Sequence, residues 1–259
     1  MLIDTHAHLD SPKFDEDREA VIARALEAGV GKIVNIGFNR ATIPTTIALA
    51  ERYEFIYAAV GWHPQDAYDM SDEDLDWIER LCSHPKVVAI GEIGLDYYWD
   101  TSPKETQHRV FREQIRLARR VNKPIVIHNR DAHADIVRIL QEEQASEVGG
   151  IMHCFSGSWE TARQCLDMNF YISFGGPVTF KNAVQPKEVL ARVPDDRLLL
   201  ETDCPYLTPH PHRGKRNESA YTTLVANSAA EIRLTSYENI LKITTDNAER
   251  LFPLLREAE

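Results

Sequence analysis

Short apolar segments alternate with longer amphipathic segments along most of the chain, and this alternation constrains the fold more than any other feature. The apolar segments are rich in Val, Ile, Phe and Tyr and are mostly apolar on both faces, which is typical of strands buried in a parallel sheet. We expect strands at Leu2–His8, Lys32–Gly37, Phe55–Gly61, Val87–Gly94, Pro124–His128, Gly150–Phe155, Tyr171–Gly175 and Leu198–Asp203.

The amphipathic segments predict helices, and two of them carry clear end signals. Gly29 is a candidate C-cap of the first helix, and Ser71 precedes three acidic residues at the start of the second. The expected helices are Asp17–Ala28, Ser71–Leu81, Pro103–Val121, Asp131–Gln144, Ser158–Asp167, Pro186–Arg192, Ser219–Ile232 and a closing helix at Ser236–Leu251.

Eight strands alternating with helices over 259 residues predict a single α/β domain, a (β/α)8 TIM barrel that spans residues 1–259. The alternative is an open doubly wound sheet. The first expected strand is not followed by the glycine-rich fingerprint that dinucleotide-binding sheets carry, which favours the barrel.

Composition excludes several classes of protein. A formal net charge of -11 argues against a broad basic surface for nucleic acid, although a local cationic site stays open. No apolar stretch approaches the roughly 20 residues that span a bilayer, and no signal peptide is visible. The four cysteines form no CxxC pair, so we expect reduced thiols and a cytoplasmic protein. The oligomeric state is left open, and a monomer is compatible with the sequence.

Six side chains that can bind a metal stand at the carboxyl ends of the expected strands, where the active site of a barrel lies. They are His6, His8, Glu92, His128, His153 and Asp203. On a strand, residues i and i+2 point to the same side, so His6 and His8 should converge. Burying so many polar groups without a metal would be costly.

The mixture of imidazole and carboxylate ligands suits Zn, Mn, Fe, Ni or Mg, and the sequence does not choose among these ions. Six ligands exceed what one catalytic ion requires. Two divalent ions about 3.5–4 Å apart, bridged by a carboxylate, fit the number better. Glu92 is the expected bridge, with His6, His8 and Asp203 on one ion and His128 and His153 on the other.

The expected reaction is attack by a metal-activated water, with Asp203 as the group that accepts its proton. Glu201 lies two residues earlier and either assists proton transfer or orients a metal ligand. Cys154 and Cys204 adjoin His153 and Asp203 on the chain, so we expect both thiols to pack outward.

Four further residues are candidates for binding substrate. Arg130 follows His128 by two residues, and His63 ends the third expected strand. Arg213 and Lys215 lie in the loop after the last strand, where Gly214 permits close approach of the backbone.

Several short motifs together resemble the TatD family of the amidohydrolase superfamily. They are Ile3–His8, Gly61–Pro64, Gly91–Asp96, His128–Arg130, His153–Gly157 and Glu201–Pro205, in the family's order along essentially the whole chain. The resemblance implies a divalent-metal hydrolase of the deoxyribonuclease type, acting as a 3′-end exonuclease. Many relatives in the wider superfamily bridge their metals with a carboxylated lysine. No lysine ends the fourth or fifth expected strand here, and Glu92 takes that role in the TatD pattern.

Three classes of function are compatible with the sequence. The leading hypothesis is a metal-dependent exonuclease on DNA, attacking single strands or frayed ends because a chain of net charge -11 repels long polyanions. The second is another metallohydrolase, acting on a cyclic amide, lactone or phosphate ester. The acidic composition, and the absence of a recognisable aromatic stacking groove in the sequence, keep this second class open. The third, a scaffold without catalysis, is disfavoured by the complete ligand set.

Overall fold

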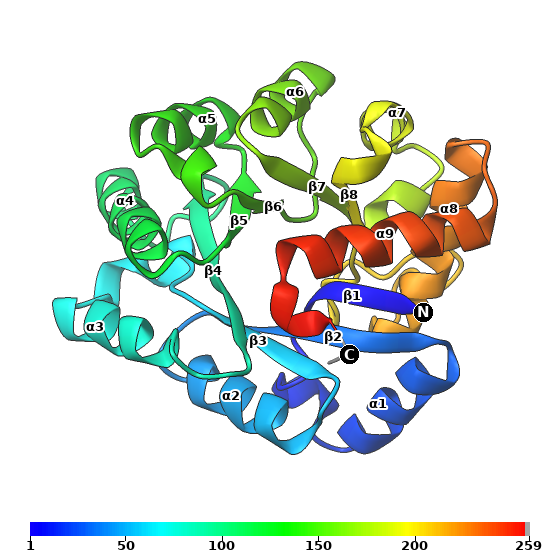
Figure 1. The fold of residues 1–259 in the computed structure, drawn as a ribbon, viewed down its shortest axis with the longest axis horizontal. Helices are drawn as coiled ribbons and strands as arrows, with labels where there is room; N and C mark the ends of the chain where they lie inside the picture. Colours follow the sequence, from blue (N-terminus) through cyan, green and yellow to red (C-terminus); the bar gives the residue numbers. More distant parts are fainter. Residues whose placement is uncertain (257–259) are drawn as a thin grey trace.

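Eight parallel strands pair with one another in chain order within residues 1–256, the part of the chain that the computed structural model describes (Figure 1). An isolated parallel bridge between Ala7 and the segment after β8, at Cys204, leaves the barrel nearly closed. The strands are β1 Leu2–Ala7, β2 Val30–Gly37, β3 Ile56–Val60, β4 Val87–Asp96, β5 Ile125–Arg130, β6 Gly150–Met152, β7 Phe170–Phe174 and β8 Leu198–Leu200. The predicted α/β TIM barrel is therefore confirmed.

Helices surround the ring of strands, and α9 with the segment after it lies across the barrel in the view of Figure 1. The helices are α1 Arg18–Glu27, α2 Thr42–Arg52, α3 Asp72–Leu81, α4 Lys104–Val121, α5 His133–Glu142, α6 Trp159–Asp167, α7 Val184–Arg192, α8 Thr222–Ile232 and α9 Tyr237–Leu251. Short 3-10 turns connect several of these elements. The expected helices correspond to α1 and to α3 through α9.

Helix α2 was not predicted from the sequence. Its first turn contains Pro44, and β-branched threonines at 42, 45 and 46 lower its helix propensity. Proline is tolerated in a first turn because the N–H it lacks would have no partner inside the helix. Burial of Ile43, Thr46, Leu49 and Ala50 against the neighbouring strands stabilises the helix despite this propensity.

The two predicted helix-end signals are confirmed. The Ser71 hydroxyl accepts a hydrogen bond from the Asp74 amide, and the Asp74 carboxylate accepts one from the Ser71 amide, which together form a capping box. Gly29, just after α1, has φ +88°, a left-handed conformation that glycine adopts without steric cost.

Apolar side chains form two layers of core. The larger cluster fills the space between the strands and the surrounding helices. The smaller cluster draws side chains from every strand, which identifies it as the barrel interior, and Phe252 and Leu255 pack against it after α9. Because the barrel is filled by packed side chains, a reactive site has to be built at one of its ends.

The strands end earlier than the sequence indicated on one side of the barrel. β6 ends at Met152 and β8 at Leu200, so His153 and Asp203 lie in the loops that follow. His128 lies inside β5, which extends to Arg130. Within residues 1–256, no helix is both long enough and apolar enough to cross a membrane.

Candidate metal centre

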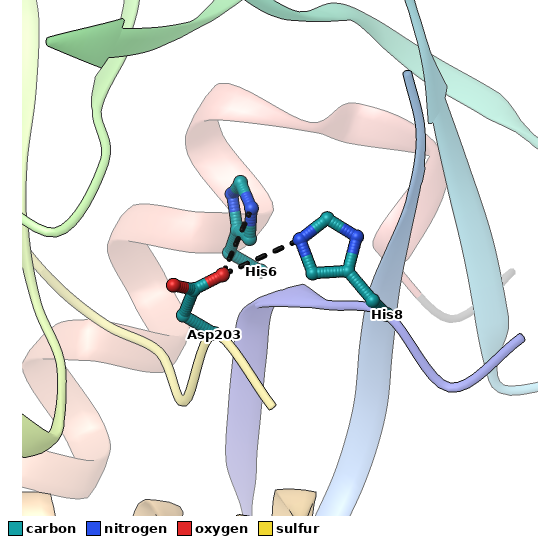
Figure 2. Close-up of side chains that lie close together, drawn as sticks. All are labelled: His6, His8 and Asp203. Carbon is teal, nitrogen blue, oxygen red and sulfur yellow. Dashed lines mark ion pairs between the residues drawn. The ribbon is translucent and has the colours of Figure 1, made fainter. Parts of the chain in front are cut away.

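His6, His8 and Asp203 converge at the carboxyl end of β1 (Figure 2). The two imidazole rings lie with their centroids 5.1 Å apart. His8 Nε2 lies 3.3 Å and His6 Nε2 3.6 Å from the same Asp203 oxygen, Oδ1. The Asp203 amide donates to the His6 carbonyl at 2.9 Å, which holds this carboxylate next to β1. The predicted convergence of the two histidines is therefore present.

Glu92, on β4, lies at the centre of the cluster. Its Oε2 atom is 3.4 Å from His6 Nε2, and its Oε1 atom is 2.7 Å from His128 Nδ1 and 3.2 Å from His153 Nε2. The carboxylate thus faces imidazoles from β1, β5 and the loop after β6. This is the position that the sequence analysis expected of a bridging ligand.

His153 is held between a stacking partner and a carboxylate. Its ring stacks on the His6 ring with the centroids 3.7 Å apart and an angle of 15° between the planes. Its Nδ1 atom lies 2.7 Å from Glu201 Oε1, so Nε2 is directed towards Glu92. A carboxylate on the far nitrogen of a metal-binding histidine fixes the ring's orientation and raises its basicity. Glu201 therefore has the contact expected of a residue that orients a ligand.

His63 was predicted to bind substrate, and it lies among the other imidazoles. Its Nε2 atom is 3.8 Å from Glu92 Oε1, and it forms a candidate ligand group with Glu92 and His128. Burial and the nearby His128 lower the pKa of His63 to about 3, which keeps the ring neutral. A neutral imidazole is suited to donating a lone pair to a cation, so His63 is a candidate metal ligand as well as the predicted substrate-binding residue.

Asp96, at the end of β4, belongs to the site but was not among the residues predicted from the sequence. Its Oδ2 atom lies 2.9 Å from His128 Nε2, opposite the contact that His128 makes with Glu92. The sequence signal for Asp96 was its spacing of four residues from Glu92, because residues four apart on a strand point to the same side. Asp96 therefore holds His128 by one ring nitrogen while the other faces Glu92.

Asp4 is a second residue that the sequence analysis missed. It is fully buried in β1, where its carboxylate accepts hydrogen bonds from the Thr202 amide at 2.9 Å and the Thr202 hydroxyl at 2.6 Å. Burial raises the pKa of Asp4 to about 7, against the lowering effect of these hydrogen bonds. Asp4 fastens β1 to the segment that carries Asp203, and its only sequence signal was an acidic residue inside an apolar strand.

The polar atoms of the cluster fit a divalent cation. Within the described chain, both ring nitrogens of His6 are buried without a hydrogen-bond partner, an arrangement that is costly in a protein interior. Burial alone would raise the pKa of Glu92, but His153, His6 and His128 lower it well below its usual range. An ionised carboxylate facing unsatisfied imidazole nitrogens is the donor set that Zn, Mn or Ni takes.

A cavity of about 850 Å³ opens above these residues, and its wall includes His8, Glu92, His128 and Asp203. Arg130 also lines it, as predicted, with its guanidinium 4.4 Å from the centroid of the Tyr98 ring. The expectation that Cys154 packs outward is wrong, because Cys154 lines the cavity as well. Its backbone has φ +42°, so the alternation of an extended strand does not apply there. Cys204 is fully buried, with its sulfur 3.7 Å from Ser219 Oγ.

Arg213 and Lys215 lie in the loop after β8, outside the set of residues that line the cavity. The Arg213 guanidinium packs 3.9 Å from the centroid of the Phe180 ring. The Lys215 carbonyl accepts a hydrogen bond from the Thr208 hydroxyl at 2.5 Å, which fastens the loop to itself. Substrate binding by these two residues stays a prediction.

The chain is similar to known proteins along nearly its whole length. The profile of the TatD related DNase family matches residues 3–253. The uncharacterized metal-dependent hydrolase YabD of Bacillus subtilis (strain 168) is 62% identical over 252 residues, which cover 97% of this chain and 99% of that protein. The 3'-5' ssDNA/RNA exonuclease TatD of Cronobacter turicensis is 36% identical over 257 residues, with 97% of each chain covered.

A solved structure has the same fold. The crystal structure of YjjV, a TatD homologue from Escherichia coli K12, superimposes with a TM-score of 0.92 at 34% sequence identity, covering 97% of this chain and 98% of that one. The profile match and the 62% identical relative both span nearly the full chain. The candidate metal ligands, here called the metal-facing cluster, lie within the matched region: they are His6, His8, His63, Glu92, His128, His153, Glu201 and Asp203. The chain therefore belongs to the TatD related DNase family and is a metal-dependent hydrolase.

Proposed function

We propose that this metal-dependent hydrolase cleaves phosphodiester bonds at the 3′ ends of single-stranded DNA. The observation that carries the proposal is the surroundings of Glu92, whose carboxylate lies within 3.4 Å of imidazole nitrogens of His6, His128 and His153 inside an open cavity. The relative named as a 3'-5' ssDNA/RNA exonuclease supports the substrate class.

Two divalent ions are part of the proposal, and Mg, Mn, Zn and Ni all suit the ligands. His6, His8 and Asp203, whose ligand atoms lie close together, would hold one ion. His128 and His153 would hold the other, with His63 close to His128 and His153 also close to His6. Glu92 lies between the two groups and would bridge them. When bound, such ions lower the pKa of a coordinated water to about 7 and neutralise charge that develops on a phosphoryl group.

Asp203 is the proposed proton acceptor. Burial alone would raise the pKa of its carboxyl group, but the hydrogen bond from His8 and the nearby His153 and His6 lower it overall. The group is therefore ionised at neutral pH. Figure 2 shows both ion pairs meeting at one carboxylate oxygen, Oδ1, while the other oxygen is directed away from His6 and His8. The proposal assigns proton transfer to this second oxygen, and assigns Glu201 the orientation of His153.

Attack at chain ends follows from charge and shape. A chain of net charge -11 repels a long polyanion, so binding has to depend on the cavity itself. Arg130 is the one Lys or Arg side chain among the described residues that line the cavity. One guanidinium can hold the phosphate at the scissile bond but cannot grip an extended backbone. A free single-stranded end, which enters without deforming a duplex, fits this arrangement better than the middle of a strand.

A second candidate function has a specific observation in its favour. Besides Glu92 and Asp203, the cavity is lined by the carboxylates Asp66, Asp96 and Asp131. This acidic wall would accept a small uncharged substrate more readily than a polyanion. Hydrolysis of a cyclic amide, a lactone or a small phosphate ester by the same metal-facing residues is therefore the alternative proposal.

The test is to incubate the metal-loaded protein with 3′-labelled and 5′-labelled oligonucleotides, single-stranded and duplex. The expected result is stepwise shortening of the single strand from its 3′ end, and no cleavage by an Asp203→Asn control. A circular single strand has no ends and should resist digestion. Cleavage of the circle at the linear rate would contradict end-directed attack, and loss of all oligonucleotide cleavage with turnover of a lactone would favour the alternative.

The location in the cell is a further part of the proposal. The four cysteines lie within the described residues and form no disulfide, which accords with a reducing compartment. We therefore assign the protein to the cytoplasm, where fractionation of cells with an antibody to the chain would test the assignment.

A further inference from the structure

Aromatic side chains stand exposed at the mouth of the cavity, outside the metal-facing cluster. Among the described residues, four aromatic side chains are exposed: Tyr68, Tyr98, Trp99 and Tyr206. Trp99 and Tyr206 line the cavity, and Trp99 is 53% exposed. Beyond its edge-to-face contact with Tyr98, the Trp99 ring leaves this surface open to a ligand that enters the cavity.

Trp99 and Tyr206 follow strands on opposite sides of the barrel. Trp99 follows β4 and Tyr206 follows β8, and these strands are four positions apart in the order of an eight-stranded barrel. Because both rings line the cavity, a strand end that enters it meets an indole and a phenol ring. Exposed aromatic rings along a nucleic-acid path stack on bases, because every base has an apolar face of matching shape.

The Trp99 segment is fixed to the metal-facing cluster by one carboxylate. Asp96 Oδ1 accepts hydrogen bonds from the Tyr98 amide at 3.0 Å and the Trp99 amide at 3.1 Å. The other oxygen of Asp96 lies 2.9 Å from His128 Nε2. The Asp96 carboxylate thus links the backbone of Trp99 to the imidazole that faces Glu92.

The Arg130 side chain, a cation, lies beside the exposed aromatic residues Tyr98 and Trp99, which form the rim of the cavity on this side. The Arg130 guanidinium packs over the Tyr98 ring, and Tyr98 in turn contacts Trp99 edge-to-face with the centroids 4.9 Å apart. The rim therefore offers an apolar ring and a positive charge side by side. This pairing complements a nucleotide, which carries a flat base and an anionic phosphate on one sugar.

We propose that Trp99 stacks on the base of a nucleotide that adjoins the scissile phosphate and so positions the chain end for cleavage. The inference rests on the proposed function, and it names the residue that binds the base. Trp99 acts on substrate binding, while the metal-facing residues act on the bond that breaks. Stacking is tolerant of base identity, so Trp99 should bind all four bases alike. It should discriminate only against a nucleotide that lacks its base.

The test compares KM and kcat of the metal-loaded full chain for Trp99→Ala, Trp99→Leu and Trp99→Phe on a single-stranded oligonucleotide. Stacking of one base on an aromatic ring corresponds to roughly a 5- to 150-fold effect, so KM should rise by such a factor for Trp99→Ala. Trp99→Leu, which restores apolar area without a ring, should behave like Trp99→Ala, and Trp99→Phe should recover most of the loss. Tyr68→Ala, at an exposed ring that does not line the cavity, is the matched control and should leave KM unchanged.

A second set of substrates separates stacking from a general loss of fold. Two further oligonucleotides each lack one base, either at the terminal or at the penultimate nucleotide. The wild type should bind one of the two more weakly than it binds the intact oligonucleotide. At that position the Trp99→Ala change should cause no further rise in KM, because the interaction is already absent. Equal KM values for wild type and Trp99→Ala on intact oligonucleotide would overturn the inference and leave the proposed function standing. A wild type that cleaves no oligonucleotide would overturn both.

Discussion

Glu201 Oε1 lies 2.7 Å from His153 Nδ1, and this contact turns the opposite nitrogen of the ring towards Glu92 Oε1, 3.2 Å away. Glu201 is fully buried, and its second oxygen has no hydrogen-bond partner among the described residues. A carboxylate in this position sets both the tautomer and the direction of a metal-binding imidazole. Of the two roles that the sequence left open for Glu201, this contact favours the orientation of a metal ligand over proton transfer.

Replacement of Glu201 should therefore lower the affinity for metal, and should leave the turnover rate of fully metal-loaded protein largely unchanged. Glu201→Ala is expected to lower metal affinity by about 10- to 100-fold, the usual cost of losing such a partner. Glu201→Gln keeps an oxygen that can accept from Nδ1, and should retain more of the affinity. Calorimetric titration of metal-free protein measures both. If Glu201 instead moved a proton, Glu201→Gln would lose turnover at full metal loading and bind metal like the wild type.

Asp203→Asn should abolish nearly all turnover without unfolding the protein. The amide oxygen can still face a metal and His8, but an amide does not accept a proton from water. Loss of a general base typically costs about 10²–10⁴ in rate. The measurement is kcat on a 3′-labelled single strand, with metal content and thermal unfolding recorded on the same sample. Turnover within a few-fold of wild type at equal metal content would show that Asp203 is not the base.

The barrel, and the meeting of the candidate metal ligands at one end of it, could be predicted because both depend on local periodicity. Alternation of side chains on β1 brings His6 and His8 together, and the common direction of the strands gathers Glu92 and His128 at one end. These inferences need no knowledge of loop conformation. They hold even though β6 ends before His153.

The parts of the site that depend on loops and on long-range contacts were not predictable in the same way. Asp96 gains its role only because β4 continues to that residue and pairs with β5 beside His128. Cys154 turns into the cavity through a backbone conformation that the sequence pattern does not indicate. The position of Trp99 at the entrance depends on hydrogen bonds to Asp96, which no periodicity in the sequence reveals.

Metal removal should destabilise the fold. A ligand that binds only the folded state stabilises it by about 2.7 kcal/mol at a concentration 100 times its dissociation constant. Treatment with a chelator should therefore lower the unfolding temperature by several degrees, and re-addition of a divalent ion should restore it. Elemental analysis should find more than one equivalent of metal in the untreated protein. His8→Ala and His128→Ala should each lose part of this metal. A single equivalent of metal in the wild type would contradict the presence of two sites.

Gly91→Ala should disturb the site by packing alone. A Cβ atom at Gly91 would lie 2.6 Å from Val126 Cβ and 3.0 Å from the Val126 carbonyl oxygen, directly before Glu92 on β4. Overpacking of this kind typically costs about 1–3 kcal/mol. Urea denaturation should show the loss of stability, and metal content should fall with it. Gly175→Ala is the matched control, because its Cβ would meet its nearest atom at an ordinary 3.5 Å.

Glu143 should contribute stability that disappears in acid. Its side chain is 8% exposed and accepts hydrogen bonds from Arg112 and Arg116, whose contacts outweigh burial and lower the pKa of the carboxyl group. A group with a lowered folded pKa stabilises the protein above its unfolded pKa of about 4.3 and loses that contribution as the pH falls through the folded value. Urea unfolding at pH 7 and at steps below pH 5 should show Glu143→Gln less stable than wild type at neutral pH. The difference should shrink in acid, because protonation removes the same charge. A constant difference for Glu143→Gln down to pH 3 would contradict the assignment.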